Sequence, residues 1–195
     1  DIKWVSAEEL GNGKNTDKYL SDVHGIVVSG RFGEKGLNGK IEAVKYAREN
    51  NIPFLGLCLG MQCAVIEFAR NVCGIDADSE VIHKKRNSNG EMRLGSYSCN
   101  IKPGTLLYEA YGTDTVSERY RNKYEFNNKY KEEITSKGMI ISATSPDEIL
   151  VEAIELERHP WFVGTQYHPE YKSRANRPHP VFREFIKAAL KHQQK

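Results

Sequence analysis

Short apolar runs and segments of helical periodicity alternate through the first third of the chain. The runs at 25–28 (GIVV) and 53–57 (PFLGL) have the length and composition of buried strands, and helical spacing of apolar residues follows each of them, at 40–50 and 59–71. Strand–helix–strand–helix order is typical of parallel strands joined by right-handed crossovers. We therefore expect an α/β fold, an open, mostly parallel twisted sheet with helices on both faces.

Further strands and helices are expected in the rest of the chain. Strands are predicted at 93–101, 139–144, 151–156 and 162–166, and helices at 105–111, 128–137 and 180–191. In the last helix, the spacing of Val181, Phe185 and Leu190 predicts that all three face inward. Residues 81–90 are polar and rich in turn formers, so we expect a surface excursion there. No repeat or linker is visible, and residues 1–195 read as one domain.

Composition, charge and cysteine content argue against several classes of protein. Hydrophobic residues make up 39% and charged residues 28% of the 195 residues, and the net charge of +2 provides no strong field for nucleic acid or a membrane surface. No apolar run approaches the roughly 20 residues of a membrane helix, and the first residues lack the layout of a signal peptide. The four cysteines show no C-x-x-C pair and no metal-site spacing with histidine. We expect a cytoplasmic protein that binds no metal, nucleic acid or membrane.

Cys58 stands between two glycines, in the sequence GLCLG, where the strand at 53–57 meets the next helix. A strand that ends in Gly-x-Cys-x-Gly and enters a helix has the form of a nucleophile elbow, in which a strained turn exposes the central side chain. The free N–H groups at the helix N-terminus favour a thiolate and can stabilise an oxyanion. The alternative is that Cys58 is an ordinary buried cysteine and that its flanking glycines serve only close packing of helix and strand. We interpret Cys63, Cys73 and Cys99 as ordinary buried cysteines.

His168 is the histidine best placed to act as the base that a thiolate nucleophile needs. It follows the strand at 162–166 and precedes Pro169 and Glu170, and the proline restricts the backbone of the histidine before it. Imidazole and carboxylate then lie together at the C-terminal edge of a strand, where sites form in open α/β sheets. Glu170 can hold the imidazole tautomer. Alone, H-P-E also suits an ordinary loop histidine, but with the cysteine elbow it indicates a catalytic pair.

These two motifs together resemble the class I, or triad, glutamine amidotransferases. Longer stretches are similar to the glutaminase domain of CTP synthases, at residues 40–71, 92–99, 123–128, 144–147 and 166–182. The resemblance runs from about Ile2 to Leu190 and so covers nearly the whole chain.

The resemblance implies that L-glutamine is hydrolysed through a covalent intermediate. Cys58 would attack the side-chain amide and form a γ-glutamyl thioester. His168 would take the thiol proton and later protonate the departing ammonia, and Glu170 would orient His168. The oxyanion hole would be formed by the backbone N–H groups of Arg31 and Leu59. The implied substrate-binding residues are Gly30, Phe32, Gln62, Glu80 and Lys123.

Two of these positions depart from the family pattern. Arg31 stands where the family has glycine, and a side chain there costs roughly 1–2 kcal/mol if the loop requires a positive φ. Lys123 stands where the family usually has arginine, and lysine cannot make the bidentate fork that binds a carboxylate. We therefore expect weaker glutamine binding than is usual in the family.

Ammonia acceptor and partners are implied only by the resemblance. In the whole enzyme, a synthase domain uses ATP and Mg²⁺ to aminate UTP, GTP is the usual activator, and the assembly is a homotetramer; the glutaminase step needs no cofactor. That synthase domain, on the same or another chain, is the expected partner, and we expect it and the family's first strand–helix unit to be missing here. The alternatives are another class I amidotransferase or a γ-glutamyl hydrolase with a different ammonia acceptor, and a catalytically weak interaction domain.

Overall fold

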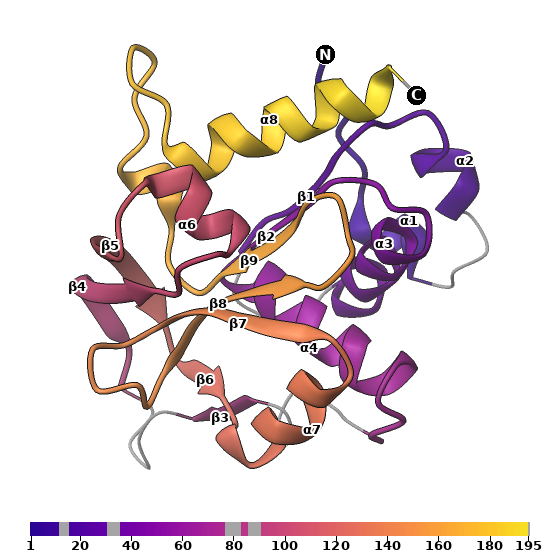
Figure 1. Ribbon diagram of the computed structural model, residues 1–195. Helices are drawn as coiled ribbons and strands as arrows, with labels where there is room; N and C mark the ends of the chain where they lie inside the picture. The colour runs from indigo at the N-terminus through magenta and orange to yellow at the C-terminus, as the bar shows by residue number, and fades with distance from the viewer. Residues whose placement is uncertain (12–15, 31–35, 77–82, 86–90, 195) are drawn as a thin grey trace.

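A seven-stranded sheet forms the centre of the molecule (Figure 1). The computed structural model describes residues 1–11, 16–30, 36–76, 83–85 and 91–194, with only the backbone at 83–85. In spatial order, the strands are β1 (Ile26–Val28), β2 (Phe54–Leu57), β9 (Phe162–Thr165), β8 (Val151–Leu156), β7 (Met139–Thr144), β4 (Arg93–Ile101) and β5 (Thr115–Asn122). A second sheet pairs β3 (His83–Lys85) with β6 (Tyr124–Phe126).

The sheet is mixed, so the α/β fold is confirmed but the expectation of mostly parallel strands is wrong. β1 pairs with β2 and β2 with β9 in parallel, whereas β9, β8, β7, β4 and β5 pair in antiparallel order. The reason lies in the connections, because short turns join β7 to β8 and β8 to β9 without a crossover helix. Parallel pairing is therefore confined to the three strands that surround Cys58.

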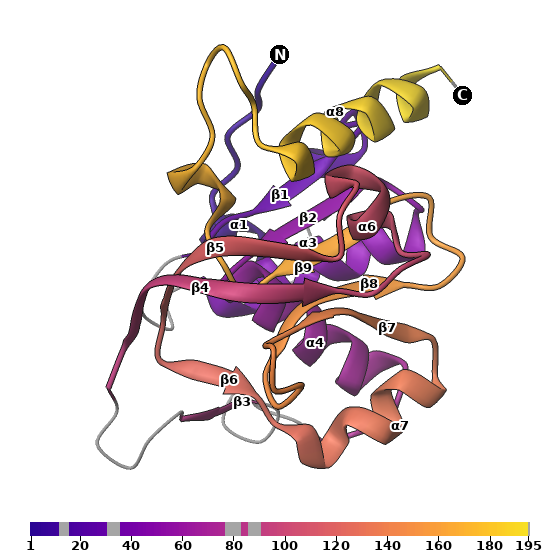
Figure 2. The same ribbon diagram turned by 60° about the vertical axis from the view of Figure 1, so that its left-hand side comes forward.

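Helices cover both faces of the sheet, as expected (Figures 1 and 2). The helices are α1 (Ala7–Leu10), α2 (Thr16–Leu20), α3 (Leu37–Glu49), α4 (Leu59–Asn71), α6 (Leu106–Tyr111), α7 (Lys131–Ser136) and α8 (Pro180–Gln193), with 3₁₀ turns η1 (Asn128–Tyr130) and η2 (Pro169–Tyr171). One apolar core lies beneath α3 and α4, and a second lies beneath α6 and α8. Among the described residues, no helix is long and apolar enough to cross a membrane.

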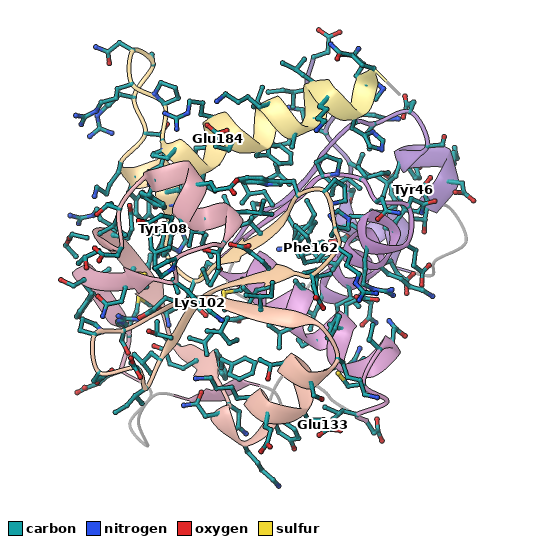
Figure 3. The ribbon with its side chains drawn as sticks, viewed as in Figure 1. Tyr46, Lys102, Tyr108, Glu133, Phe162 and Glu184 are labelled. Atoms are coloured by element: carbon teal, nitrogen blue, oxygen red, sulfur yellow. The ribbon has the colours of Figure 1, made fainter. Side chains whose placement is uncertain are left out.

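The inner strands are buried on both faces, which explains their continuous apolar sequences. Every residue of β2, β8 and β9 is buried. The Phe54 and Phe162 rings stack across β2 and β9 with centroids 4.4 Å apart, and Figure 3 shows Phe162 within the body of the molecule. This packing fixes the two strands whose ends carry the candidate chemistry.

One local expectation is wrong. Leu190 does not face inward with Val181 and Phe185; it lies near the end of α8 and is 54% exposed. Of the expected surface excursion at 81–90, only 83–85 lies within the described residues, and it forms β3, which pairs with β6 outside the main sheet. By contrast, the strands expected at 93–101, 139–144 and 151–156 are observed with those bounds.

Candidate active site

The candidate site is assembled where β2 and β9 end side by side. Leu57 is in register with Thr165 in the parallel pair, and the Cys58 N–H donates a 2.7 Å hydrogen bond to the Thr165 carbonyl. Because parallel strands end at the same edge, the residues after each strand meet there. This register brings Cys58 beside the segment Gln166–His168.

Cys58 has the backbone of a nucleophile elbow. Its φ is 51° and its ψ is −102°, a sparsely populated backbone conformation that costs an L-residue roughly 1–3 kcal/mol. Its carbonyl accepts a 3.2 Å hydrogen bond from the Gln62 N–H in the first turn of α4. The bonds to Thr165 and Gln62 therefore hold the strained turn from both sides and place the sulfur at the N-terminus of a 13-residue helix.

The glycines around Cys58 allow the strand and helix backbones to touch. A Cβ on Gly60 would lie 2.0 Å from the carbonyl oxygen of Val28, and one on Gly56 would lie 2.7 Å from the Gly60 carbonyl carbon. Both contacts are with backbone atoms, which cannot rotate away. The double glycine is therefore a steric requirement of the sharp turn that presents Cys58.

We expect Gly60→Ala to damage both stability and activity, because α4 must move away from β1 and carry Cys58 with it. The overpacking should cost about 1–3 kcal/mol of unfolding free energy. Urea unfolding and an assay of the glutamine hydrolysis expected from the sequence would measure the two effects. Gly11→Ala is the matched control, because Gly11 has an ordinary φ of −59° and an added Cβ would have no atom nearer than 3.3 Å. Equal effects of the two substitutions would contradict the steric argument.

His168 and Glu170 form a short contact on the η2 turn. His168 Nδ1 lies 2.6 Å from Glu170 Oε1, and the His168 N–H donates a 2.8 Å hydrogen bond to the Arg119 carbonyl on β5. The Tyr171 ring stacks on the His168 ring, with centroids 5.0 Å apart and an interplanar angle of 16°. Strand, carboxylate and ring together fix the orientation of the imidazole.

The His168 ring also lies close to the Cys58 side chain, which contributes to raising the pKa of His168. A Cβ on Gly30 would lie 3.0 Å from the Cys58 Cβ and 3.4 Å from the His168 Cε1, so Gly30 lies against both side chains. Within the described part of the chain, His168 Nε2 is buried and makes no well-aligned hydrogen bond. Catalytic hydrogen bonds are often loose before substrate binds. Nε2 is therefore free to exchange a proton with Cys58 or its substrate.

The electrostatics favour a charged pair. Burial alone would lower the pKa of His168, but the neighbouring Cys58 sulfur and Glu170 carboxylate outweigh burial and raise this pKa to about 10. Burial would raise the pKa of Glu170, but its bond to His168 outweighs burial and lowers this pKa. The site thus stabilises an imidazolium between a carboxylate and the sulfur.

These shifts predict a pH window for the stabilising effect of Glu170. The His168 contribution is complete below its ordinary pKa of 6.5 and is lost as pH rises towards about 10. The Glu170 contribution is complete above its ordinary pKa of 4.5 and is lost as pH falls through the lowered value. We expect the stability difference between the wild type and Glu170→Gln to be largest between these two ordinary values. Urea unfolding across pH tests this, and a difference that does not vary with pH would contradict it.

The other cysteines have different environments. Burial raises the pKa of Cys63 and of Cys99 to about 12, and it also raises the pKa of Cys73. These three groups therefore stay as neutral thiols near neutral pH. Among the described residues, no group of three or more histidine, cysteine, aspartate or glutamate side chains could hold a metal ion.

The remaining residues expected at the site are placed as follows. Leu59 directly follows Cys58 as the first residue of α4, and Gln62 is buried one turn later. Gln62 Nε2 donates to the Tyr124 carbonyl at 3.4 Å, beside the exposed Lys123 that links β5 to β6. Arg31, Phe32 and Glu80 lie outside the described residues.

Sequence reasoning missed two side chains at the site, Gln166 and Tyr171. Gln166 is fully buried, and its Nε2 lies 3.6 Å from the Cys58 sulfur. A signal for it was present, because a lone glutamine follows an apolar strand two residues before His168, on the same side of an extended chain. Tyr171 gave no such signal, since its contact depends on the η2 turn.

The chain is similar to known proteins over nearly its whole length. The chain is 53% identical to the CTP synthase of Carboxydothermus hydrogenoformans and 51% identical to that of Moorella thermoacetica, over 98% of this chain and 38% of each relative. The chain thus spans well under half the length of these curated relatives. The solved structure of the Trypanosoma brucei CTPS glutaminase domain with bound acivicin matches with a TM-score of 0.92 and 37% identity, over 98% of this chain and 81% of that one.

The family profile described as "Glutamine amidotransferase class-I" matches residues 2–188, nearly the whole chain. That match covers every described residue of the site, from Gly30 to Tyr171. This protein therefore belongs to the class-I glutamine amidotransferase family.

Proposed function

We propose that this chain hydrolyses L-glutamine to glutamate and ammonia. The Cys58 thiolate attacks the side-chain amide carbon, and His168 donates its proton to the departing nitrogen, which leaves as ammonia. Water then attacks the γ-glutamyl thioester while His168 accepts a proton, and glutamate and the thiolate are released. Glu170 holds His168 in the orientation that both transfers need.

One observation carries the proposal: Cys58 and the His168–Glu170 pair lie just after the ends of two adjacent parallel strands, β2 and β9. The raised pKa of His168, to about 10, supports an imidazolium that can protonate the leaving nitrogen. The similar proteins support glutamine as the substrate, since two are CTP synthases and the third is the glutaminase domain of a CTP synthase. The Trypanosoma brucei domain was solved with bound acivicin, so we expect acivicin to bind this chain too, at Cys58.

We propose binding roles from the family resemblance and, for the described residues, from their positions near the sulfur. We assign one oxyanion donor to the Leu59 N–H, at the start of α4, and the other to the Arg31 N–H. Gly30, which lies against Cys58 and His168, leaves room for the substrate amide. The amino-acid end of glutamine is assigned to Gln62 and Lys123, together with Phe32 and Glu80.

The ammonia acceptor is proposed from the relatives. CTP synthase is the name of both curated relatives, so we propose that ammonia passes to a synthase part that aminates UTP with ATP and Mg²⁺. GTP activation and a tetrameric assembly belong to this proposal for the whole enzyme. The segment between η2 and α8 offers an exposed surface for that partner, with Arg174 and Arg177 exposed in it.

The test uses glutamine labelled with ¹⁵N in the side-chain amide. The chain alone should release glutamate and labelled ammonia in equal amounts. Mixed with the synthase part of the Carboxydothermus enzyme, UTP, ATP and Mg²⁺, it should place the label in CTP. Hydrolysis without transfer to UTP would assign a different acceptor, and absence of hydrolysis in both mixtures would overturn the proposed activity.

A further inference from the structure

Gln166 links the candidate nucleophile to the first turn of α4. Its side chain is fully buried, and its backbone N–H is held by a 2.8 Å hydrogen bond to the Glu152 carbonyl on β8. Its Nε2 lies 3.6 Å from the Cys58 sulfur, and its Oε1 accepts a 3.1 Å hydrogen bond from Gln62 Nε2. A buried amide thus touches both the sulfur and a residue of the proposed substrate pocket.

The orientation of this amide follows from its neighbours. The Tyr124 carbonyl can only accept, so the side-chain NH₂ group of Gln62 must face it, at 3.4 Å. That same NH₂ group then donates to Gln166, which must present its oxygen to Gln62. The NH₂ group of Gln166 is therefore the end that faces the Cys58 sulfur.

Two groups beside the Cys58 sulfur stabilise opposite ionisation states of that sulfur. The Arg121 carbonyl lies 3.8 Å from the Cys58 sulfur and can accept a hydrogen bond only from the protonated thiol. The Gln166 NH₂ group donates, and such a bond strengthens when the acceptor carries a negative charge. Gln166 therefore opposes the effect of Arg121 and favours the charged sulfur.

We propose that Gln166 is a positioning residue for the reaction, whose amide N–H holds the Cys58 sulfur as a thiolate aimed at the substrate. The proposal rests on the proposed glutaminase function for its role in turnover. The hydrogen bond from Gln62 fixes the orientation of the Gln166 amide. The two buried side-chain amides thus connect the proposed substrate pocket to the Cys58 sulfur. Gln166 acts through Cys58 and is assigned no contact with the substrate.

The test is the pH dependence of Cys58 alkylation by iodoacetamide in Gln166→Met. Methionine keeps the length of glutamine and lacks the donor. Hydrogen bonds to charged groups are strong enough that their loss should raise the pH of half-maximal alkylation by about one to two units, or slow the reaction at pH 7 about ten- to hundredfold. Gln166→Glu should shift the midpoint in the same direction, because a carboxylate repels a neighbouring thiolate.

Gln194→Met is the matched control, because Gln194 lies exposed at the end of α8, and it should leave the alkylation profile unchanged. Peptide mapping of Cys73 in the same samples reports any general opening of the fold. A merely structural role for Gln166 would lower stability without moving the midpoint. Wild-type midpoints in both Gln166 variants, or in whichever of them folds, would overturn the proposal.

Measuring glutamine hydrolysis distinguishes a failure of this proposal from a failure of the proposed function. If the wild type hydrolyses glutamine, Gln166→Met should lower kcat by about ten- to hundredfold, in line with the alkylation shift. If the wild type does not hydrolyse glutamine, the proposed function fails, while the alkylation midpoints still decide whether Gln166 stabilises the thiolate. A normal kcat combined with a shifted midpoint would overturn the role of Gln166 in turnover.

Discussion

Cys58→Ala should abolish glutamine hydrolysis, with a loss of about 10⁴- to 10⁶-fold in kcat. The thioester needs a sulfur at the end of β2, and alanine at this position offers no nucleophile. No other described cysteine replaces it, because Cys63 and Cys99 are buried thiols with pKa values raised to about 12. Release of glutamate, measured at saturating glutamine, gives the loss directly.

Cys73→Ala is the control for that substitution. Cys73 follows α4, is half-buried and has a pKa raised by burial, so its replacement should leave hydrolysis unchanged. Thermal unfolding of both variants shows whether each remains folded. Substantial hydrolysis by a folded Cys58→Ala would mean that the reaction does not pass through this thiol.

His168→Ala should lose nearly as much activity as Cys58→Ala, because nucleophile and base act as one unit. The alanine variant has no group to hold the proton from the sulfur or to protonate the departing ammonia. Glu170→Ala should be less damaging, since the His168 backbone is still bonded to Arg119 and its ring still stacks on Tyr171. We expect a measurable remnant of activity in that variant.

Steady-state assays of the single variants and of the Cys58→Ala, His168→Ala double variant test this division. The double variant should be no worse than Cys58→Ala alone, because each substitution already disables the same unit. A His168→Ala rate near that of the wild type would show that another group is the base. A Glu170→Ala rate below that of His168→Ala would contradict an orienting role.

The parts of the fold that could be predicted are those whose sequence pattern is set by burial. β2, β8 and β9 are buried on both faces, so their apolar runs indicate strands directly. β5 is different, because its residues alternate between exposed and buried and include Glu118, which is buried against His179. Its strand character depends on pairing with β4, which the local sequence does not reveal.

The same distinction holds at the site. Cys58, His168 and Glu170 were predicted because a glycine pair and a proline mark the turns that place them. Gln166 was missed although its spacing from His168 was a signal, because its contacts with Cys58 and Gln62 depend on the register that sets β9 beside β2. The mostly parallel sheet was predicted from the first two strand–helix units, whereas the later strands β7, β8 and β9 are joined by connections too short for crossovers.

The most direct test of the central claim is covalent labelling with a glutamine analogue that carries a diazo-ketone. The reagent needs a pocket for the amino-acid end of glutamine and a thiolate beside it, so it tests binding and nucleophile together. We predict complete loss of activity with one label per chain, found by peptide mapping on Cys58 and prevented by excess L-glutamine. Labelling spread evenly over Cys58, Cys63, Cys73 and Cys99, or labelling that glutamine does not slow, would contradict the account.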